Sequence, residues 1–180
     1  MVQFITPYEA ARLVRDDTTL AVSGQAGFGT PDGLFKALHD RYAEEGHPRS
    51  LTLVKISGTS DGGGRGGDRL AADGLLQTII TSHFGAEKKL ADKVTKNSCL
   101  AYTVPAGTLL DLYRALAAGR KGVWTDIGLH TLATRASTAA KPMTRRWPKE
   151  RISFAWLISR EKSTSIILPF PLIFASFAAL

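Results

Sequence analysis

Short apolar segments alternate with helix-like segments along the first 120 residues, and this alternation restricts the fold more than any other feature. The expected strands are residues 19–23, 51–57, 77–82 and 100–104. The expected helices are residues 6–15, 30–45, 86–96 and 108–118. Strands joined by helices of this length run in the same direction, because each connection has to cross back over the sheet. The sequence therefore predicts an α/β fold with a mostly parallel sheet and crossover helices.

The starts of two helices carry recognisable signals. Thr6 and Glu9 form a capping-box pattern around Pro7 at the first helical position. The segment Thr30-Pro31-Asp32 is expected to cap the second helix in a similar way. These signals fix where the first two helices should begin.

Two glycine-rich loops follow the first and second expected strands. The loop from Gly24 to Gly29 joins a strand to a helix, so its backbone N–H groups could hold a phosphate or stabilise an oxyanion. It could equally be a tight turn that needs positive φ angles, and its glycine spacing is not the G-x-G-x-x-G dinucleotide motif. The loop from Gly58 to Asp68 could meet a ligand or another chain, or could be a mobile surface loop. In a parallel sheet both loops lie at the carboxyl edge, where ligands bind.

Other chemically active residue types give weaker indications. None of the four histidines has a partner at metal-ligand spacing, so no metal site is expected. His83 follows the third strand, where active-site residues often lie, but a structural role is favoured. Cys99 is expected to be a small core residue rather than a nucleophile, and Ser23 lacks the G-x-S-x-G pattern. A single cysteine and no signal-peptide pattern at the N-terminus favour the cytoplasm.

The composition changes near residue 130. All 17 glycines lie at or before Gly128, and residues 136–180 hold seven basic and two acidic residues, or +5 of the net +7. No zinc, RNP or helix-turn-helix pattern accompanies this charge, so nucleic-acid binding is not expected. We therefore divide the chain into an α/β domain, residues 1–135, and an atypical basic, then apolar, tail, residues 136–180.

Three interpretations of the tail remain open. Residues 163–180 are apolar but interrupted by Pro169 and Pro171, and they fall short of the about 20 residues that span a membrane. The tail could be a membrane anchor, a packed C-terminal extension, or a translation in the wrong reading frame. We favour the last, because the change is abrupt and no helix or strand period continues across it.

Three collinear stretches resemble the N-terminal domain of family I coenzyme A (CoA) transferases, the acetate/3-oxoacid group. They begin AVSGQAGFGTPDG, DGGGRGGDRLAADG and AYTVPAGTLLDLY, and together with their surroundings they cover residues 6 to 131. The resemblance implies an α/β half-enzyme that transfers CoA from a short-chain acyl-CoA or 3-oxoacyl-CoA to a carboxylate. The CoA thioester is then a substrate, with no permanently bound cofactor, and ketone-body or short-chain fatty-acid metabolism is implied. A glutamate from a second, C-terminal half forms a glutamyl-CoA thioester.

The resemblance also assigns site residues. Gly27, Phe28 and Gly29 match the oxyanion-hole loop, and Gly24, Gln25 and Gly107 are expected to contact substrate. Ala106 stands where the family often has glutamine, and no glutamate of this chain lies in the family's glutamate motif.

Four functions follow as alternatives. The first two are a truncated N-terminal domain that is inactive alone and an α-type subunit that needs a separate glutamate-bearing partner. A non-catalytic CoA- or anion-binding α/β module and a membrane-tethered fragment are the other two, and we favour the first.

Overall fold

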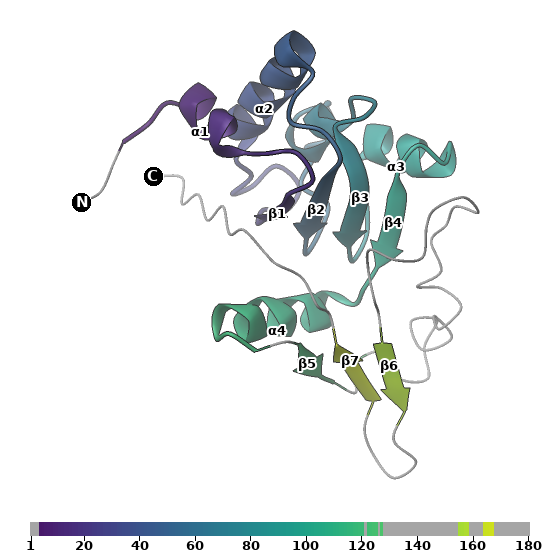
Figure 1. Ribbon diagram of the computed structural model, residues 1–180. Coiled ribbons are helices and arrows are strands. Elements are labelled where there is room, and N and C mark those ends of the chain that lie inside the picture. The colour runs from purple at the N-terminus through teal and green to yellow at the C-terminus, as the bar shows by residue number, and fades with distance from the viewer. Residues whose placement is uncertain (1–3, 121, 126, 128–154, 159–163, 168–180) are drawn as a thin grey trace.

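The computed structural model describes residues 4–120, 122–125, 127, 155–158 and 164–167 (Figure 1). The helices are α1 (Pro7–Leu13), α2 (Asp32–Glu45), α3 (Lys88–Thr95) and α4 (Ala106–Ala117), with a 3-10 helix η1 (Gly66–Leu70). The strands are β1 (Thr19–Val22), β2 (Leu51–Lys55), β3 (Leu76–Thr81), β4 (Leu100–Thr103), β5 (Val123–Trp124), β6 (Ala155–Ile158) and β7 (Thr164–Ile167). The helices and strands expected before residue 120 are all present, and each begins and ends within two residues of its expected bounds.

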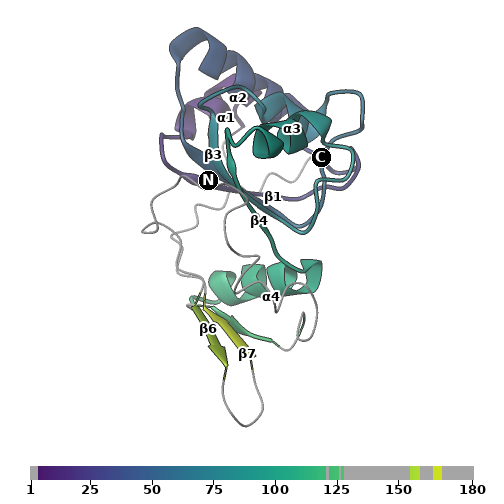
Figure 2. The same ribbon diagram turned by 90° about the vertical axis from the view of Figure 1, so that its right-hand side faces the viewer.

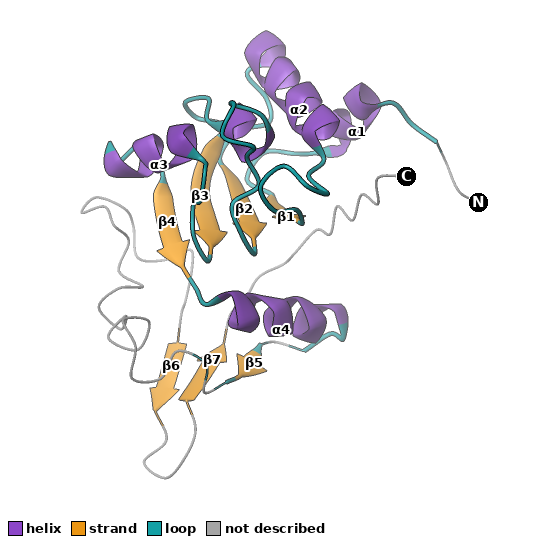
Figure 3. Cartoon of the chain, turned by 180° about the vertical axis from the view of Figure 1, so that it is seen from behind, coloured by secondary structure: helices purple, strands orange, loops and turns teal. Residues whose placement is uncertain are grey.

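Strands β1 to β4 form one parallel sheet in chain order. The predicted α/β fold with a mostly parallel sheet and crossover helices is confirmed. The four strands point the same way, so their carboxyl ends meet at one edge of the sheet, and in Figure 3 their arrowheads point toward α4. The loops that leave this edge carry most of the residues with a predicted site role.

Apolar side chains cover both faces of this sheet. On one face, Leu53 and Ile79 belong to a buried cluster with Phe35 of α2 and Leu90 of α3. On the other face, alternate strand residues pack against α4, in a cluster of Val54, Ile80, Leu100, Tyr102, Val104, Leu109 and Leu112. Figure 2 shows the result, with α1, α2 and α3 on one side of the sheet and α4 on the other. Each fully buried leucine or isoleucine contributes about 1.5–3 kcal/mol to folding.

The two predicted helix starts have different outcomes. The capping box of α1 is confirmed, because the Glu9 N–H donates to Thr6 Oγ1 at 3.3 Å and the Thr6 N–H donates to Glu9 Oε2 at 2.7 Å. The expected cap of α2 is wrong. Its N-cap is Pro31, without a side-chain hydrogen bond, and the Thr30 hydroxyl instead donates to the Thr59 carbonyl at 3.0 Å. Thr30 therefore joins two loops rather than capping a helix.

A second, antiparallel sheet has the order β5-β7-β6. Its strands β6 and β7 come from the segment for which the sequence predicts an atypical tail. The expected boundary at residue 135, the basic segment and most of the apolar run lie outside the described residues. Within the part of the chain that the structure describes, no helix is long and apolar enough to cross a membrane.

Candidate active site

The loop after β1 folds as a two-residue β-hairpin. Gln25 and Phe28 are bonded to each other in both directions, with N–H to carbonyl distances of 3.0 and 2.8 Å. The two residues between them have positive φ angles, 49° at Ala26 and 87° at Gly27, which is the type I′ pattern. Only glycine adopts such angles without strain, so Gly27 suits the tip of this turn. We call residues 24–29 the glycine hairpin.

The glycine hairpin lies on the loop that follows β2. The Ala26 N–H donates to the Gly58 carbonyl at 2.9 Å, and the Gly27 N–H donates to the Thr59 carbonyl at 3.2 Å. The Ser57 hydroxyl also donates to the Gly24 carbonyl at 3.4 Å. The two glycine-rich loops are therefore one unit at the carboxyl edge of the sheet.

The outer side of the glycine hairpin faces solvent. Phe28 is 83% exposed, an unusual state for a large apolar side chain. The N–H groups of residues 25–28 all donate within the chain, whereas the Gly29 N–H meets no acceptor among the described residues. The Gly29 N–H is thus one backbone donor that is available to an anion in this arrangement, and the oxyanion role of Gly27, Phe28 and Gly29 stays a prediction.

Gly107 lies elsewhere on the same edge. It belongs to the first turn of α4, after β4, and β2 and β3 separate it from the glycine hairpin in the sheet. Its nearest neighbour on the side-chain side is Ile127. The sheet therefore places Gly24, Gln25 and Gly107 at one edge without bringing Gly107 against the glycine hairpin.

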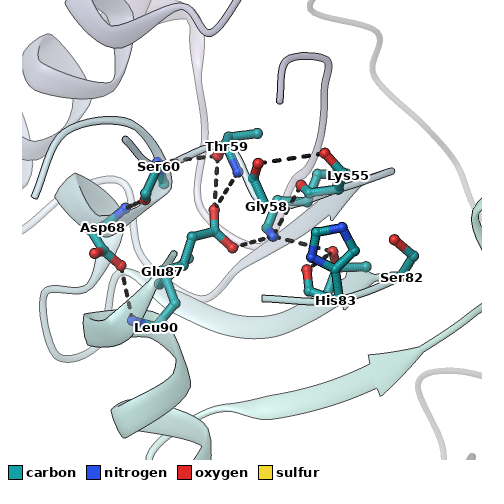
Figure 4. A network of polar contacts seen from close by, with 12 residues as sticks. Lys55, Gly58, Thr59, Ser60, Asp68, Ser82, His83, Glu87 and Leu90 are labelled. Atoms are coloured by element: carbon teal, nitrogen blue, oxygen red, sulfur yellow. Dashed lines mark hydrogen bonds and ion pairs between the residues drawn. The ribbon is translucent and has the colours of Figure 1, made fainter. Parts of the chain in front are cut away.

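A buried ion pair lies beneath the two loops (Figure 4). Lys55, the last residue of β2, donates from Nζ to Glu87 Oε2 and, at 3.2 Å, to Thr81 Oγ1. Both partners of the pair are 0% exposed. Burial lowers the pKa of Lys55, and the nearby Glu87 carboxylate opposes that shift. An ion pair without water is costly unless its other hydrogen-bonding atoms are also satisfied.

The other oxygen of Glu87 meets that condition. Glu87 Oε1 accepts the Thr59 N–H at 2.8 Å and the Thr59 hydroxyl at 2.9 Å. The Gly67 N–H donates to Thr59 Oγ1 at 3.2 Å. Thr59 therefore connects the carboxylate to the backbone of both the loop and η1.

A second buried carboxylate continues the network. The Asp68 N–H donates to Ser60 Oγ at 2.9 Å, and Asp68 Oδ1 accepts the Leu90 N–H at 3.2 Å in the first turn of α3. Burial raises the pKa of Asp68, and the Leu90 N–H counteracts part of the shift. Asp68 thus takes the place of the missing side-chain cap of α3.

Three other candidates from the sequence have clear positions. Cys99 is buried, and burial raises the pKa of its thiol to about 12, so it is a core residue as predicted. His83 is exposed after β3, and its carbonyl accepts the Thr81 hydroxyl at 2.8 Å. The glycine-rich loop after β2 is buried at Thr59 and Ser60 and exposed at residues 61–63, and its mobility and its role stay predictions.

Sequence comparison identifies the family. The family profile described as Coenzyme A transferase matches residues 4–148. The chain belongs to the coenzyme A transferase family. The match continues past residue 135, where the sequence predicts the domain boundary.

Relatives and solved structures agree with this assignment. This coenzyme A transferase chain is 34% identical over 131 residues to caffeate CoA-transferase of Acetobacterium woodii, covering 73% of the chain and 25% of that protein. It is 28% identical over 149 residues to the acetate CoA-transferase subunit alpha of Escherichia coli K12, covering 83% of the chain and 64% of the subunit. It matches the crystal structure of the acyl-CoA transferase YdiF apoenzyme from Escherichia coli O157:H7 with a TM-score of 0.80 and 26% identity, covering 94% of the chain and 32% of that structure. YdiF has also been solved as a thioester complex with CoA.

The chain spans about a quarter of the length of the first curated relatives that it matches. The predicted resemblance to CoA transferases and the fold class are confirmed. Sequence reasoning missed the network of Lys55, Thr59 and Glu87. The sequence contained one indication of this network. Lys55 lies on the same face of its strand as Leu51 and Leu53, so its side chain is directed into the core.

Proposed function

We propose that this chain forms the glycine-loop part of an acyl-CoA:carboxylate CoA transferase. In this proposal a second half, on another chain or another part of the protein, contributes the glutamate that attacks the thioester. The observation that carries the proposal is the family match over residues 4–148, which includes the glycine hairpin at the carboxyl edge of the parallel sheet.

The proposed chemistry assigns one task to this chain. Attack of a glutamate carboxylate on the thioester carbon places negative charge on the carbonyl oxygen, and backbone N–H groups at fixed positions stabilise that charge. The Gly29 N–H is one donor that meets no acceptor among the described residues and could serve this task. Removing one donor of this kind typically costs about 100- to 1000-fold in kcat.

The finer assignments are part of the same proposal. Relatives that include an alpha subunit support a partner half for this chain. Short-chain acyl or 3-oxoacid substrates, a place in ketone-body or short-chain fatty-acid metabolism, and a cytoplasmic location remain proposals.

Reconstitution with a glutamate-bearing half tests the proposal. The purified chain would be mixed with the separately expressed second half of a close relative, acetyl-CoA and a carboxylate acceptor. We expect turnover only in the mixture, and a mass increase from glutamyl-CoA on the second half alone. The matched control is Cys99→Ser, which removes the single thiol of the chain and should leave turnover unchanged.

Two results would contradict the proposal in different ways. Acetyl-CoA binding with no turnover in the mixture would favour a non-catalytic CoA-binding module. Turnover by this chain without the second half would show that the nucleophile lies within it.

A further inference from the structure

We propose that Thr59 and Glu87 are positioning residues that set the location of the glycine hairpin. The inference rests on the proposed function only for its catalytic consequence, because the contacts themselves connect the buried carboxylate to the hairpin backbone. Neither residue belongs to the glycine hairpin or to the predicted substrate contacts.

Thr59 makes this connection, because its contacts on one side are with Glu87 and those on the other side are with the glycine hairpin and Thr30. On its inner side, Thr59 donates both its N–H and its hydroxyl to Glu87 Oε1. On its outer side, the Thr59 carbonyl accepts the Gly27 N–H at 3.2 Å and the Thr30 hydroxyl at 3.0 Å. The glycine hairpin is thus held at its tip and at its C-terminal end by the same carbonyl. A change in the Thr59 backbone would move both points of attachment together.

The inner side of this connection has little room to move. Thr59 and Glu87 are both 0% exposed. A Cβ atom on Gly67 would lie against Glu87 Oε1 and within 2.8 Å of Thr59 Oγ1. A Cβ on Gly66 would lie against the Thr59 carbonyl oxygen. The glycines of η1 therefore let the backbone close tightly around Thr59, as Figure 4 shows for its contacts with Glu87.

The ion pair holds the carboxylate from the other direction. Lys55 is fixed at the end of β2 and its Nζ binds Glu87 Oε2, so the two carboxylate oxygens have different partners. The orientation of the carboxylate is therefore set by a strand of the central sheet. The path from β2 to Gly27 consists of Lys55, Glu87 and Thr59, and all its steps are hydrogen bonds.

Amide hydrogen exchange of the whole chain, measured by NMR, tests whether Thr59 and Glu87 hold the glycine hairpin, and it does not require enzymatic activity. Thr59→Val keeps the shape of the side chain but removes the hydroxyl, and Thr59→Ser keeps the hydroxyl. The matched control is Thr108→Val, because Thr108 is also buried and its hydroxyl has no partner among the described residues. We expect the Ala26 and Gly27 amides to exchange about tenfold faster in Thr59→Val, as for the loss of one buried hydrogen bond. Exchange in β2 should not change.

The conservative variants make the result specific. Thr59→Ser and Thr108→Val should exchange like the wild type at residues 26 and 27. Thr30→Val, which removes only the outer bond to the Thr59 carbonyl, should give a smaller increase at the same amides and covers the case in which Thr59→Val does not fold. Unchanged exchange at Ala26 and Gly27 in a folded Thr59→Val would overturn the inference. If Thr59→Val does not fold, unchanged exchange in Thr30→Val would overturn it.

Kinetics of the reconstituted enzyme separates this inference from the proposed function. If both hold, Thr59→Val lowers kcat with little change in KM for acetyl-CoA, and Thr59→Ser restores kcat. If the amides loosen but kcat does not change, the positioning role stands and the oxyanion role of the glycine hairpin is wrong.

Discussion

At the scale of single residues, Lys55 and Glu87 form an ion pair in which both side chains are fully buried. Lys55→Met leaves the Glu87 carboxylate buried without its cation, and such a charge costs about 3–5 kcal/mol. In Lys55→Met combined with Glu87→Gln no charge is left unpaired, so we expect the double variant to be more stable than Lys55→Met alone. Urea unfolding of the wild type, both single variants and the double variant measures this coupling.

A surface ion pair provides the control for this comparison of single and double variants. Lys36 and Asp40 form an exposed pair one turn apart on α2. Lys36→Met should change the free energy of unfolding by about 0.5 kcal/mol or less. Equal losses for Lys36→Met and Lys55→Met would contradict the account of the buried pair.

Alanine substitutions at two glycines distinguish the cost of overpacking from the gain in helix propensity. Gly67→Ala places a methyl group against Glu87 and Thr59, and overpacking of this kind costs about 1–3 kcal/mol. Gly33→Ala lies in α2 with nothing near the new methyl group, so it should stabilise the protein by about 0.5–1 kcal/mol. Thermal unfolding of the two variants should therefore shift in opposite directions, and a shift in the same direction would contradict the packing around η1.

At the scale of elements, one carboxylate joins α2 to η1. Asp32, the first residue of α2, accepts two hydrogen bonds from the Arg69 guanidinium, at 2.7 and 2.9 Å, and one from the Gly66 N–H at 2.7 Å. The hydrogen bond from Arg69 is the main cause that lowers the pKa of Asp32 below its usual 3.8. The unfolded chain then takes up this proton at a higher pH than the folded chain. The stabilisation is complete above the unfolded pKa and is lost as the pH falls through the folded pKa.

The lowered pKa of Asp32 predicts how the stability of the protein depends on pH. Asp32→Asn should destabilise the protein at about pH 6, and the difference from the wild type should shrink as the pH falls below about 4. Urea unfolding across this range measures the difference. Asp92→Asn, on the exposed face of α3, is the control and should track the wild type throughout. A difference for Asp32→Asn that grows on acidification would contradict the assigned direction.

The elements were predictable from sequence, whereas the contacts between loops were not. Periodicity places Leu53 and Lys55 on one face of β2, and the Thr6–Glu9 pattern marks the start of α1, because both depend on neighbours within a few residues. The partner of Lys55 lies 32 residues away, at the N-cap of α3, and no local pattern connects the two positions. Thr30 is the instructive case. Its hydroxyl could serve a local helix cap or a distant carbonyl, and only the packing of two loops decides between them.

At the scale of the whole molecule, the proposed function requires an exposed surface that a second half could bind. The edges of the four-stranded sheet are β1 and β4, and the chain covers about a third of the YdiF structure. The glycine hairpin follows β1 at the carboxyl edge of this sheet. Phe28 lies there with 83% of its surface exposed. An exposed aromatic side chain is a typical anchor for a protein interface.

Phe28→Ser should therefore affect assembly and leave the fold unchanged. The exposed ring contributes little to folding, so the free energy of unfolding should stay within about 0.5 kcal/mol of the wild type. Burial of a phenylalanine at an interface contributes about 1.5–3 kcal/mol, so affinity for a glutamate-bearing second half should fall by roughly tenfold or more. Leu13→Ser is the matched control, because Leu13 is 70% exposed at the end of α1, before the first strand and outside the glycine hairpin. Titration of the second half, read by CoA-transfer activity, should then shift for Phe28→Ser alone. A shift of equal size for both variants would show that surface hydrophobicity in general, rather than the tip of the glycine hairpin, controls the association.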